Sequence, residues 1–164
     1  KNNNAILEMT SKIVNKKFND DESMFSLTII TTDNGICEFS VSKEFLCCEY
    51  FGLVLGNKET KTCDVFDPLA SNGERVIDKQ TLDQLKGNII SIKYLHNQNI
   101  PDFLSQFEDS RIGDMNSYFN EIITTEGTFY VGIFNEHNGY YSHTYEVKWN
   151  NIDGVDDYVN EGTF

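Results

Sequence analysis

The stretch of sequence that decides the fold class is residues 25–42, FSLTIITTDNGICEFSVS. Apolar and polar side chains alternate along residues 25–31, which is the pattern of a strand with one buried face. Asp33-Asn34-Gly35 follows, and Asn and Gly tolerate the positive φ angles that a tight hairpin turn requires. Residues 36–42 resume a strand-like pattern, so we predict a β-hairpin here.

A second stretch of the chain begins almost alike. Residues 122–127 (IITTEG) repeat the start of residues 29–35 (IITTDNG). Each unit leads on to a chemically rich segment, FLCCEY at residues 45–50 and HNGYYSH at residues 137–143. The likeness indicates either two related hairpins or two unrelated strand–turn–strand units, and the sequence leaves both open. If the two hairpins share one sheet, we expect the cysteines of the first segment to lie close to the histidines of the second.

The two ends of the chain are expected to differ in structure. Ile6, Met9 and Ile13 recur at helical spacing, which predicts an amphipathic helix over residues 5–18. Residues 150–164 are acidic and are expected to be frayed.

The middle of the chain favours strands. Further strands are expected at residues 45–55, 88–95, 118–125, 128–134 and 140–149, the last three as a meander, and short helical segments at residues 78–86 and 102–107. We therefore predict a single α+β domain over residues 1–164, with a mainly antiparallel sheet of about seven strands in residues 25–149. An N-terminal helix within residues 1–20 and one or two short helices complete the expected fold.

Composition excludes several classes of protein. Hydrophobic residues make up 39% and aromatic residues 13% of the chain, which is enough for a packed core. No apolar run approaches the roughly 20 residues needed to span a bilayer. The net charge of −13 repels nucleic acids and anionic membranes, so we expect neither as a partner. A protein partner with a basic surface is expected instead, although such acidity also serves solubility alone.

The four cysteines predict little redox chemistry. Cys37 and Cys63 are expected to fill small apolar spaces, and the adjacent Cys47 and Cys48 would point to opposite faces of a strand. We expect reduced, partly buried thiols in a cytoplasmic protein, since no secretory signal pattern is visible.

A metal site is one alternative for the segments rich in cysteine and histidine. Cys47, Cys48, His137 and His143 are thiolates and imidazoles, the ligands that zinc prefers. Because the chain has no Cys-x-x-Cys or His-x-x-x-His spacing, we expect no cofactor and keep zinc as an alternative.

A cysteine nucleophile is a second alternative. One of the two histidines could activate a cysteine, with Glu136 or Glu49 orienting the imidazole. The apolar neighbours of Cys47 and Cys48 favour inert thiols, so a non-enzymatic protein is expected, with a hydrolase as the third choice.

The turn Asn138-Gly139-Tyr140-Tyr141 is the most distinctive short motif. With His137 and His143 it could line a binding site in which His137, Asn138, Tyr140, Tyr141 and His143 contact a ligand or a partner. The alternative is structural, because Asn-Gly forms tight hairpin turns and one of two adjacent tyrosines faces the core.

These motifs resemble those of a family of small uncharacterised phage and bacterial proteins. The resemblance is carried by Cys47-Cys48, Thr125-Glu126-Gly127 and Asn138-Gly139-Tyr140-Tyr141, over about residues 25 to 149. Glu49 departs from the pattern, where a small polar residue is expected, and so does Ser142-His143, where two glycines are expected. The resemblance implies a phage or mobile-element setting and transfers no catalytic residue.

Together these patterns predict an acidic protein that acts by binding another protein, as an inhibitor, immunity or phage anti-defence factor. The alternative is a small-ligand or metal-binding domain.

Overall fold

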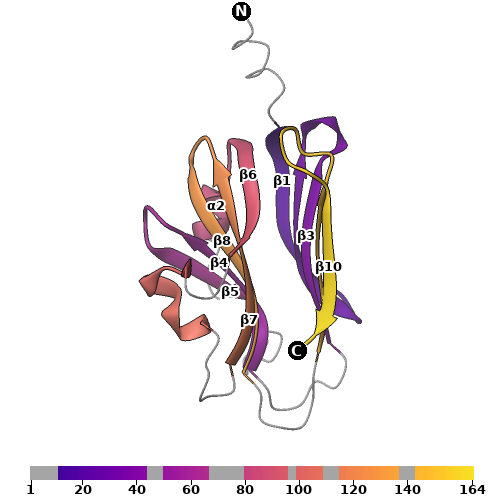
Figure 1. Ribbon diagram of the computed structural model, residues 1–164, viewed down its shortest axis with the longest axis vertical. Coiled ribbons are helices and arrows are strands. Elements are labelled where there is room, and N and C mark those ends of the chain that lie inside the picture. Colours follow the sequence, from indigo (N-terminus) through magenta and orange to yellow (C-terminus); the bar gives the residue numbers. More distant parts are fainter. Residues whose placement is uncertain (1–10, 44–49, 67–79, 96–98, 109–114, 137–142) are drawn as a thin grey trace, which may run out of the picture.

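The computed structural model describes residues 11–43, 50–66, 80–95, 99–108, 115–136 and 143–164. Within these residues the chain forms a ten-stranded antiparallel sheet that folds into two facing layers (Figure 1). One layer holds β4 to β8, and the other holds β1, β2, β3, β9 and β10. The elements are β1 (Ser11–Asp20), β2 (Met24–Thr31), β3 (Ile36–Ser42), β4 (Tyr50–Asn57), β5 (Thr62–Phe66), α2 (Gln80–Gln84), β6 (Asn88–Leu95), β7 (Met115–Thr124), β8 (Gly127–Glu136), β9 (Thr144–Asn150), β10 (Tyr158–Thr163) and the 3-10 helices η1 (Thr32–Asn34) and η3 (Asp102–Phe107).

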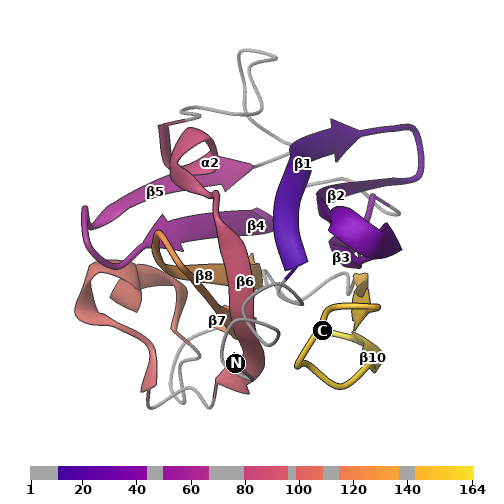
Figure 2. The same ribbon diagram turned by 90° about the horizontal axis from the view of Figure 1, so that it is seen from above.

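The two layers are joined by one short ladder. The strand order is β10-β9-β3-β2-β1-β6-β7-β8-β4-β5, and the link between the layers is β1 with β6. Only Ser11 and Lys12 of β1 pair with β6, opposite Ile89 and Asn88, and β1 then continues along β2. Beyond this link, β6 diverges from β1 and from the layer that contains β1, as the view from above shows (Figure 2).

The main core lies between the layers and is rich in phenylalanine. Phe25 of β2 packs against Phe51 and Phe66 of the opposite layer, with ring centroids 5.8 and 5.2 Å apart. Phe18 of β1 lies 4.9 Å from Phe66. These rings come from β1 and β2 in one layer and from β4 and β5 in the other, and their burial between the layers holds the layers together.

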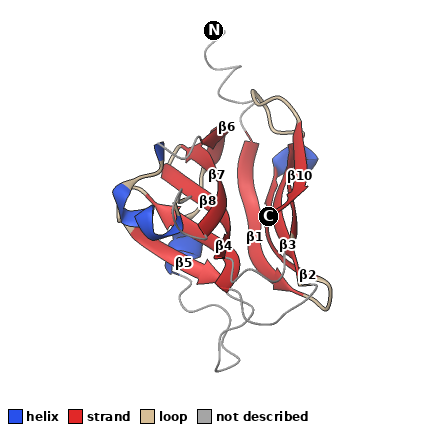
Figure 3. Cartoon of the chain, turned by 60° about the horizontal axis from the view of Figure 1, so that its bottom comes forward, coloured by secondary structure: helices blue, strands red, loops and turns tan. Residues whose placement is uncertain are grey.

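A second core covers the outer face of the β4–β8 layer. Leu104 and Phe107 of η3 are fully buried there and pack with Phe119, Tyr130 and Phe134 of the sheet. Of the short helices, η3 forms this core, whereas η1 lies in the other layer between β2 and β3 (Figure 3). Leu82 of α2 belongs to the main core. The layer is thus buried on both faces, which explains the nearly continuous burial along β8.

The predicted α+β class with an N-terminal helix is wrong. Residues 11–20 form β1, in which Ser11 and Ile13 are buried while Lys12 and Val14 are exposed. Residues 5–10 of the predicted helix lie outside the described residues, and from Ile13 onward β1 pairs with β2 instead of forming a helix. An isolated helix of this length is marginal in water, whereas a strand beside an existing hairpin gains a full ladder.

The expected number of strands and the frayed tail are also wrong. The chain forms ten strands in the described residues instead of about seven, and the tail contains β10, which pairs with β9 from Tyr158 opposite Trp149 to Thr163 opposite Thr144. Strand β9 lies between β3 and β10 and not beside β8, so the predicted meander does not form.

Several local predictions are confirmed. The hairpin of β2 and β3 is present, and its turn has positive φ at Asp33 (62°) and Asn34 (65°), whereas Gly35 is extended with φ of −70°. The strand at 88–95 and the short helices near 80–84 and at 102–107 are present. The two similar hairpins, β2–β3 and β7–β8, both exist, but they lie in opposite layers and do not pair with each other.

Candidate functional site

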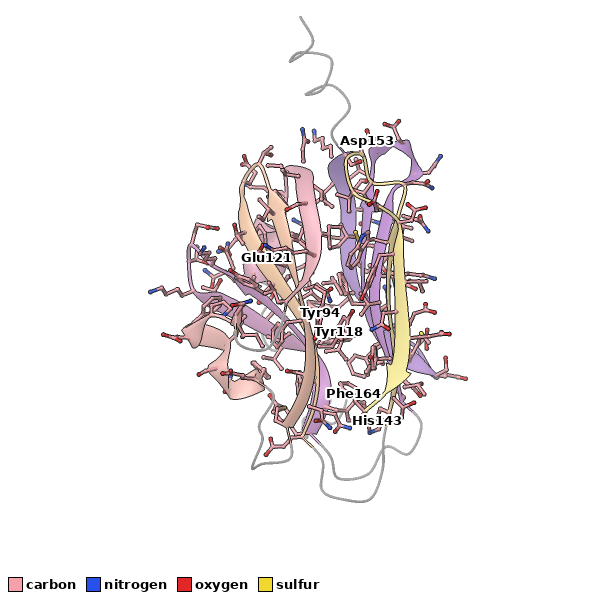
Figure 4. All side chains as sticks on the ribbon, in the orientation of Figure 1. Tyr94, Tyr118, Glu121, His143, Asp153 and Phe164 are labelled. Carbon is pink, nitrogen blue, oxygen red and sulfur yellow. The ribbon has the colours of Figure 1, made fainter. Side chains whose placement is uncertain are left out.

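A cluster of tyrosines lies where β6 and β7 face β9 and β10. The ring of Tyr94 stacks on Tyr118 with centroids 4.7 Å apart, and Tyr118 lies 5.4 Å from Tyr145. The hydroxyls of Tyr118 and Tyr158 are in hydrogen-bond contact. Figure 4 shows Tyr94 and Tyr118 together in the space between the layers. Four tyrosines from four strands therefore meet at one side of the molecule.

Strand register explains these contacts. Tyr94 of β6 pairs with Asn120 of β7, so Tyr118 is its diagonal neighbour on the same face. Tyr158 of β10 pairs directly with Trp149 of β9, and their rings stack with centroids 4.3 Å apart. Each layer thus presents a stacked aromatic pair to the other.

A groove of about 350 Å³ opens beside this cluster. Ser91, Ile92, Lys93 and Tyr94 of β6 form one wall, and Trp149 with Gly154, Val155, Asp156, Asp157 and Tyr158 forms the other. We call it the inter-sheet groove. Tyr94, whose ring stacks on Tyr118, is 39% exposed and lines the groove.

The wall formed by the β9–β10 connection is held by hydrogen bonds. The indole nitrogen of Trp149 donates to the carbonyl of Asp156 at 3.1 Å, and the amide of Asn151 donates to the carboxylate of Asp157 at 3.1 Å. The amide of Asp153 donates to the hydroxyl of Ser11 at 3.0 Å, which ties the connection to β1. These bonds fix the backbone at Asp153 and Asp156 and hold the carboxylate of Asp157 before any partner arrives.

The charge in the groove is predominantly negative. Asp156 and Asp157 are exposed, and no salt bridge within the described residues involves either of them. The one lysine of the groove, Lys93, lies 3.4 Å from the carboxylate of Glu121. Its charge is therefore partly neutralised, and the groove favours a cation.

The half-buried phenol of Tyr118 is a poor acid. Burial raises the pKa of Tyr118 above its ordinary value, and the hydrogen bond with Tyr158 raises it further, while Asn160 partly offsets both. Tyr118 is therefore neutral at physiological pH.

A second depression, of about 380 Å³, lies on the outer face of β3, β9 and β10. Its floor includes Ser40 and Ser42, and Glu146 and Glu161 stand beside it. Its only aromatic residue, Tyr145, packs against Tyr118 and Phe164. Unlike the inter-sheet groove, this depression does not lie between the two layers.

Of the predicted binding residues, the structure describes His143 alone. Its side chain is 1% exposed and stacks on Phe51 with centroids 3.8 Å apart. Its backbone exchanges two hydrogen bonds with Phe164, at 2.9 and 3.0 Å. His137, Asn138, Tyr140 and Tyr141 lie outside the described residues, so the predicted binding set stays a prediction.

The cysteines and the metal alternative are described in part. Cys37 is fully buried, and burial raises the pKa of its thiol to about 12. Cys63 is half-buried and packs against the second core, so both residues act as the apolar fillers expected. Cys47 and Cys48 lie outside the described residues. Within the part of the chain that the structure describes, no cluster of three or more His, Cys, Asp or Glu could hold a metal ion.

Sequence reasoning did not identify the groove. Tyr118 and Tyr158 are 40 residues apart and sit in strands whose facing could not be known from the pattern of either one. The available signal in the sequence was Tyr158, which directly follows the acidic segment from Asp153 to Asp157.

None of the helices in the described residues is long and apolar enough to cross a membrane.

Comparison of this chain with known proteins found no relative. No family model, no curated protein and no solved structure matches this chain.

Proposed function

We propose that this protein is a non-enzymatic binding factor that holds a positively charged segment of another protein in the inter-sheet groove. Such a factor would act as an inhibitor, an immunity protein or a phage anti-defence protein. The observation that carries the proposal is one groove that combines the exposed ring of Tyr94 with the carboxylates of Asp156 and Asp157.

This combination suits arginine and lysine side chains. A guanidinium group stacks on an aromatic ring and donates paired hydrogen bonds to a carboxylate. Tyr94 supplies the ring on one wall, and Asp156 supplies the carboxylate on the other. The two contacts can thus be made by neighbouring side chains of one segment.

The charge of the whole chain supports a basic partner. The net charge of −13 attracts a cationic protein from a distance and speeds its association. The same charge disfavours a second copy of this chain as the natural partner.

The state of Cys37 argues against this one cysteine as a nucleophile. A thiol with a pKa near 12 stays protonated at neutral pH, and it is the thiolate that attacks substrates. Cys37 is also sealed in the main core, away from any substrate.

A second candidate function is the binding of a small cationic ligand in the same groove. The volume of about 350 Å³ lies in the range of small-molecule sites. Such a ligand would use the same ring and carboxylates, so it is tested by the same variants.

Binding of a blocked octapeptide of alternating arginine and valine tests the proposal. We expect fluorescence anisotropy to show saturable binding, and no binding of the matched peptide with glutamate in place of arginine. Asp156→Asn should weaken binding roughly twofold to fivefold, because it removes one exposed charge contact.

The matched control is Glu22→Gln. Glu22 is an exposed acid between β1 and β2, outside the groove, and its replacement changes the net charge by the same amount. Equal losses for the two variants would mean that the peptide responds to overall charge and not to the groove, and the proposal would fail.

A further inference from the structure

The inter-sheet groove runs along an incompletely paired strand edge. β6 pairs with β7 along most of its length, but on its other side the described strands pair only with Asn88 and Ile89. β1 turns away after Lys12 to follow β2. On that side, residues 90–93 pair with no strand in the described part of the chain.

This edge is the one that lines the groove. Four consecutive residues of β6, Ser91 to Tyr94, form the groove wall. Successive side chains of a strand point to opposite faces, so a wall made by consecutive residues follows the strand's edge and not one of its faces. The groove therefore gives access to the edge of β6.

From this we infer that an extended, arginine-containing segment of a partner protein binds by adding a strand to the free edge of β6. The inference rests on the proposed function and specifies how the partner is held. Backbone hydrogen bonds to residues 90–93 would supply affinity, and alternate side chains of the added strand would reach the groove.

Charge complementarity selects this occupant. Asp156 and Asp157 stand opposite β6 across the groove, where they can meet the basic side chains of an added strand. Ile90, at the irregularity of the β6–β7 ladder, is 51% exposed and offers an apolar contact. A second copy of this chain would bring a further net charge of −13 to the groove and is disfavoured.

Lys93 is the residue of this edge that opposes unselective pairing with other strands. Exposed lysines on edge strands oppose pairing with other chains. The Lys93 side chain is 62% exposed, and its ammonium lies 3.4 Å from the carboxylate of Glu121, its cross-strand partner on β7. An added strand therefore has to leave this ammonium in solvent, whereas its own basic side chains can meet Asp156 and Asp157 across the groove.

Selective N-methylation of the probe peptide tests the binding mode. In an added antiparallel strand, alternate residues direct their N–H groups to the neighbouring strand, and the others direct theirs away. Two versions of the blocked arginine–valine octapeptide are needed, one N-methylated at every arginine and one at every valine. We expect one version to lose at least about tenfold in affinity and the other to stay within about twofold of the unmethylated peptide.

The outcomes separate this inference from the proposed function. If the unmethylated peptide fails to bind, or binds equally well to Asp156→Asn, the proposed function fails. If it binds through Asp156 but both methylated peptides keep their affinity, or both lose it equally, strand addition is overturned while the basic-partner function stands. Asp156 lies in a connection and outside β6, so Asp156→Asn leaves the strand pairing of the sheet in place.

Discussion

At Tyr118, one phenol joins the two layers. Its ring contacts Tyr94 on the same layer and Tyr145 on the other, and its hydroxyl meets that of Tyr158. Two phenolates cannot share a hydrogen bond and repel each other, so this contact needs at least one of the two hydroxyls to keep its proton. The contact between the layers is therefore sensitive to alkaline pH.

Tyr118→Phe should weaken the alkaline sensitivity of the fold. The pKa of Tyr118 is raised in the folded protein from an ordinary value of 10.0 by burial and by the hydrogen bond with Tyr158. Just above the ordinary value, the unfolded chain has released this proton and the folded chain has kept it, so the free energy of unfolding falls as pH rises. Because Tyr118 is only partly buried, we expect a contribution below about 1 kcal/mol per pH unit.

Urea unfolding at about pH 7, pH 9 and pH 11 measures this contribution. At about pH 7 the phenol is neutral in both states, so the difference there reports only the lost hydroxyl. An identical fall in stability between about pH 9 and pH 11 for the two proteins would contradict the assignment to Tyr118.

At the scale of elements, β7 and β8 fit together through a glycine. Gly132 pairs directly with Phe119, and the ring of Phe119 covers it. A Cβ at Gly132 would lie 2.4 Å from two ring atoms of Phe119. The glycine therefore lets a fully buried ring lie flat on the neighbouring strand, beneath η3.

Gly132→Ala should destabilise the protein by about 1–3 kcal/mol, because the added methyl group overpacks the second core. The matched background is Phe119→Leu, which removes the ring that the methyl group meets. In that background Gly132→Ala should cost clearly less, and the two variants should show a coupling energy in urea unfolding. Equal costs in the two backgrounds would mean that the contact between Gly132 and Phe119 does not set the cost.

At the scale of the whole molecule, the net charge of −13 acts on folding and on binding in opposite ways. Like charges repel one another in the compact state, which lowers stability. The same charges attract a cationic partner. Salt screens both interactions.

Raising sodium chloride from about 0.05 M to about 0.5 M should therefore stabilise the fold and weaken binding of the arginine peptide. Thermal unfolding and anisotropy on the same samples measure the two effects. Asp156→Asn should show a shallower salt dependence of binding than Glu22→Gln. Peptide affinity that does not change with salt would show that charge does not drive the interaction.

The groove is also a property of the whole molecule. It exists because β1 pairs with β6 only at Ser11 and Lys12, and because the β9–β10 connection folds back to Ser11. Neither contact is local. A prediction based on individual segments could find the tyrosines but not the wall that faces them.

The sequence by itself determined the local β-structure of this protein. Alternation and turn chemistry identified the hairpin of residues 25–42, the strand at 88–95 and the short helix at 102–107, because these depend on residues close together in the chain. Only the tertiary structure decided the rest. Pairing between distant segments makes strands of residues 11–20 and 158–163 and places β9 between β3 and β10. It also brings Tyr94, Tyr118 and Asp156 to one side of the molecule. A strand gains most of its stability from neighbouring strands, and its own sequence does not specify which strands these are.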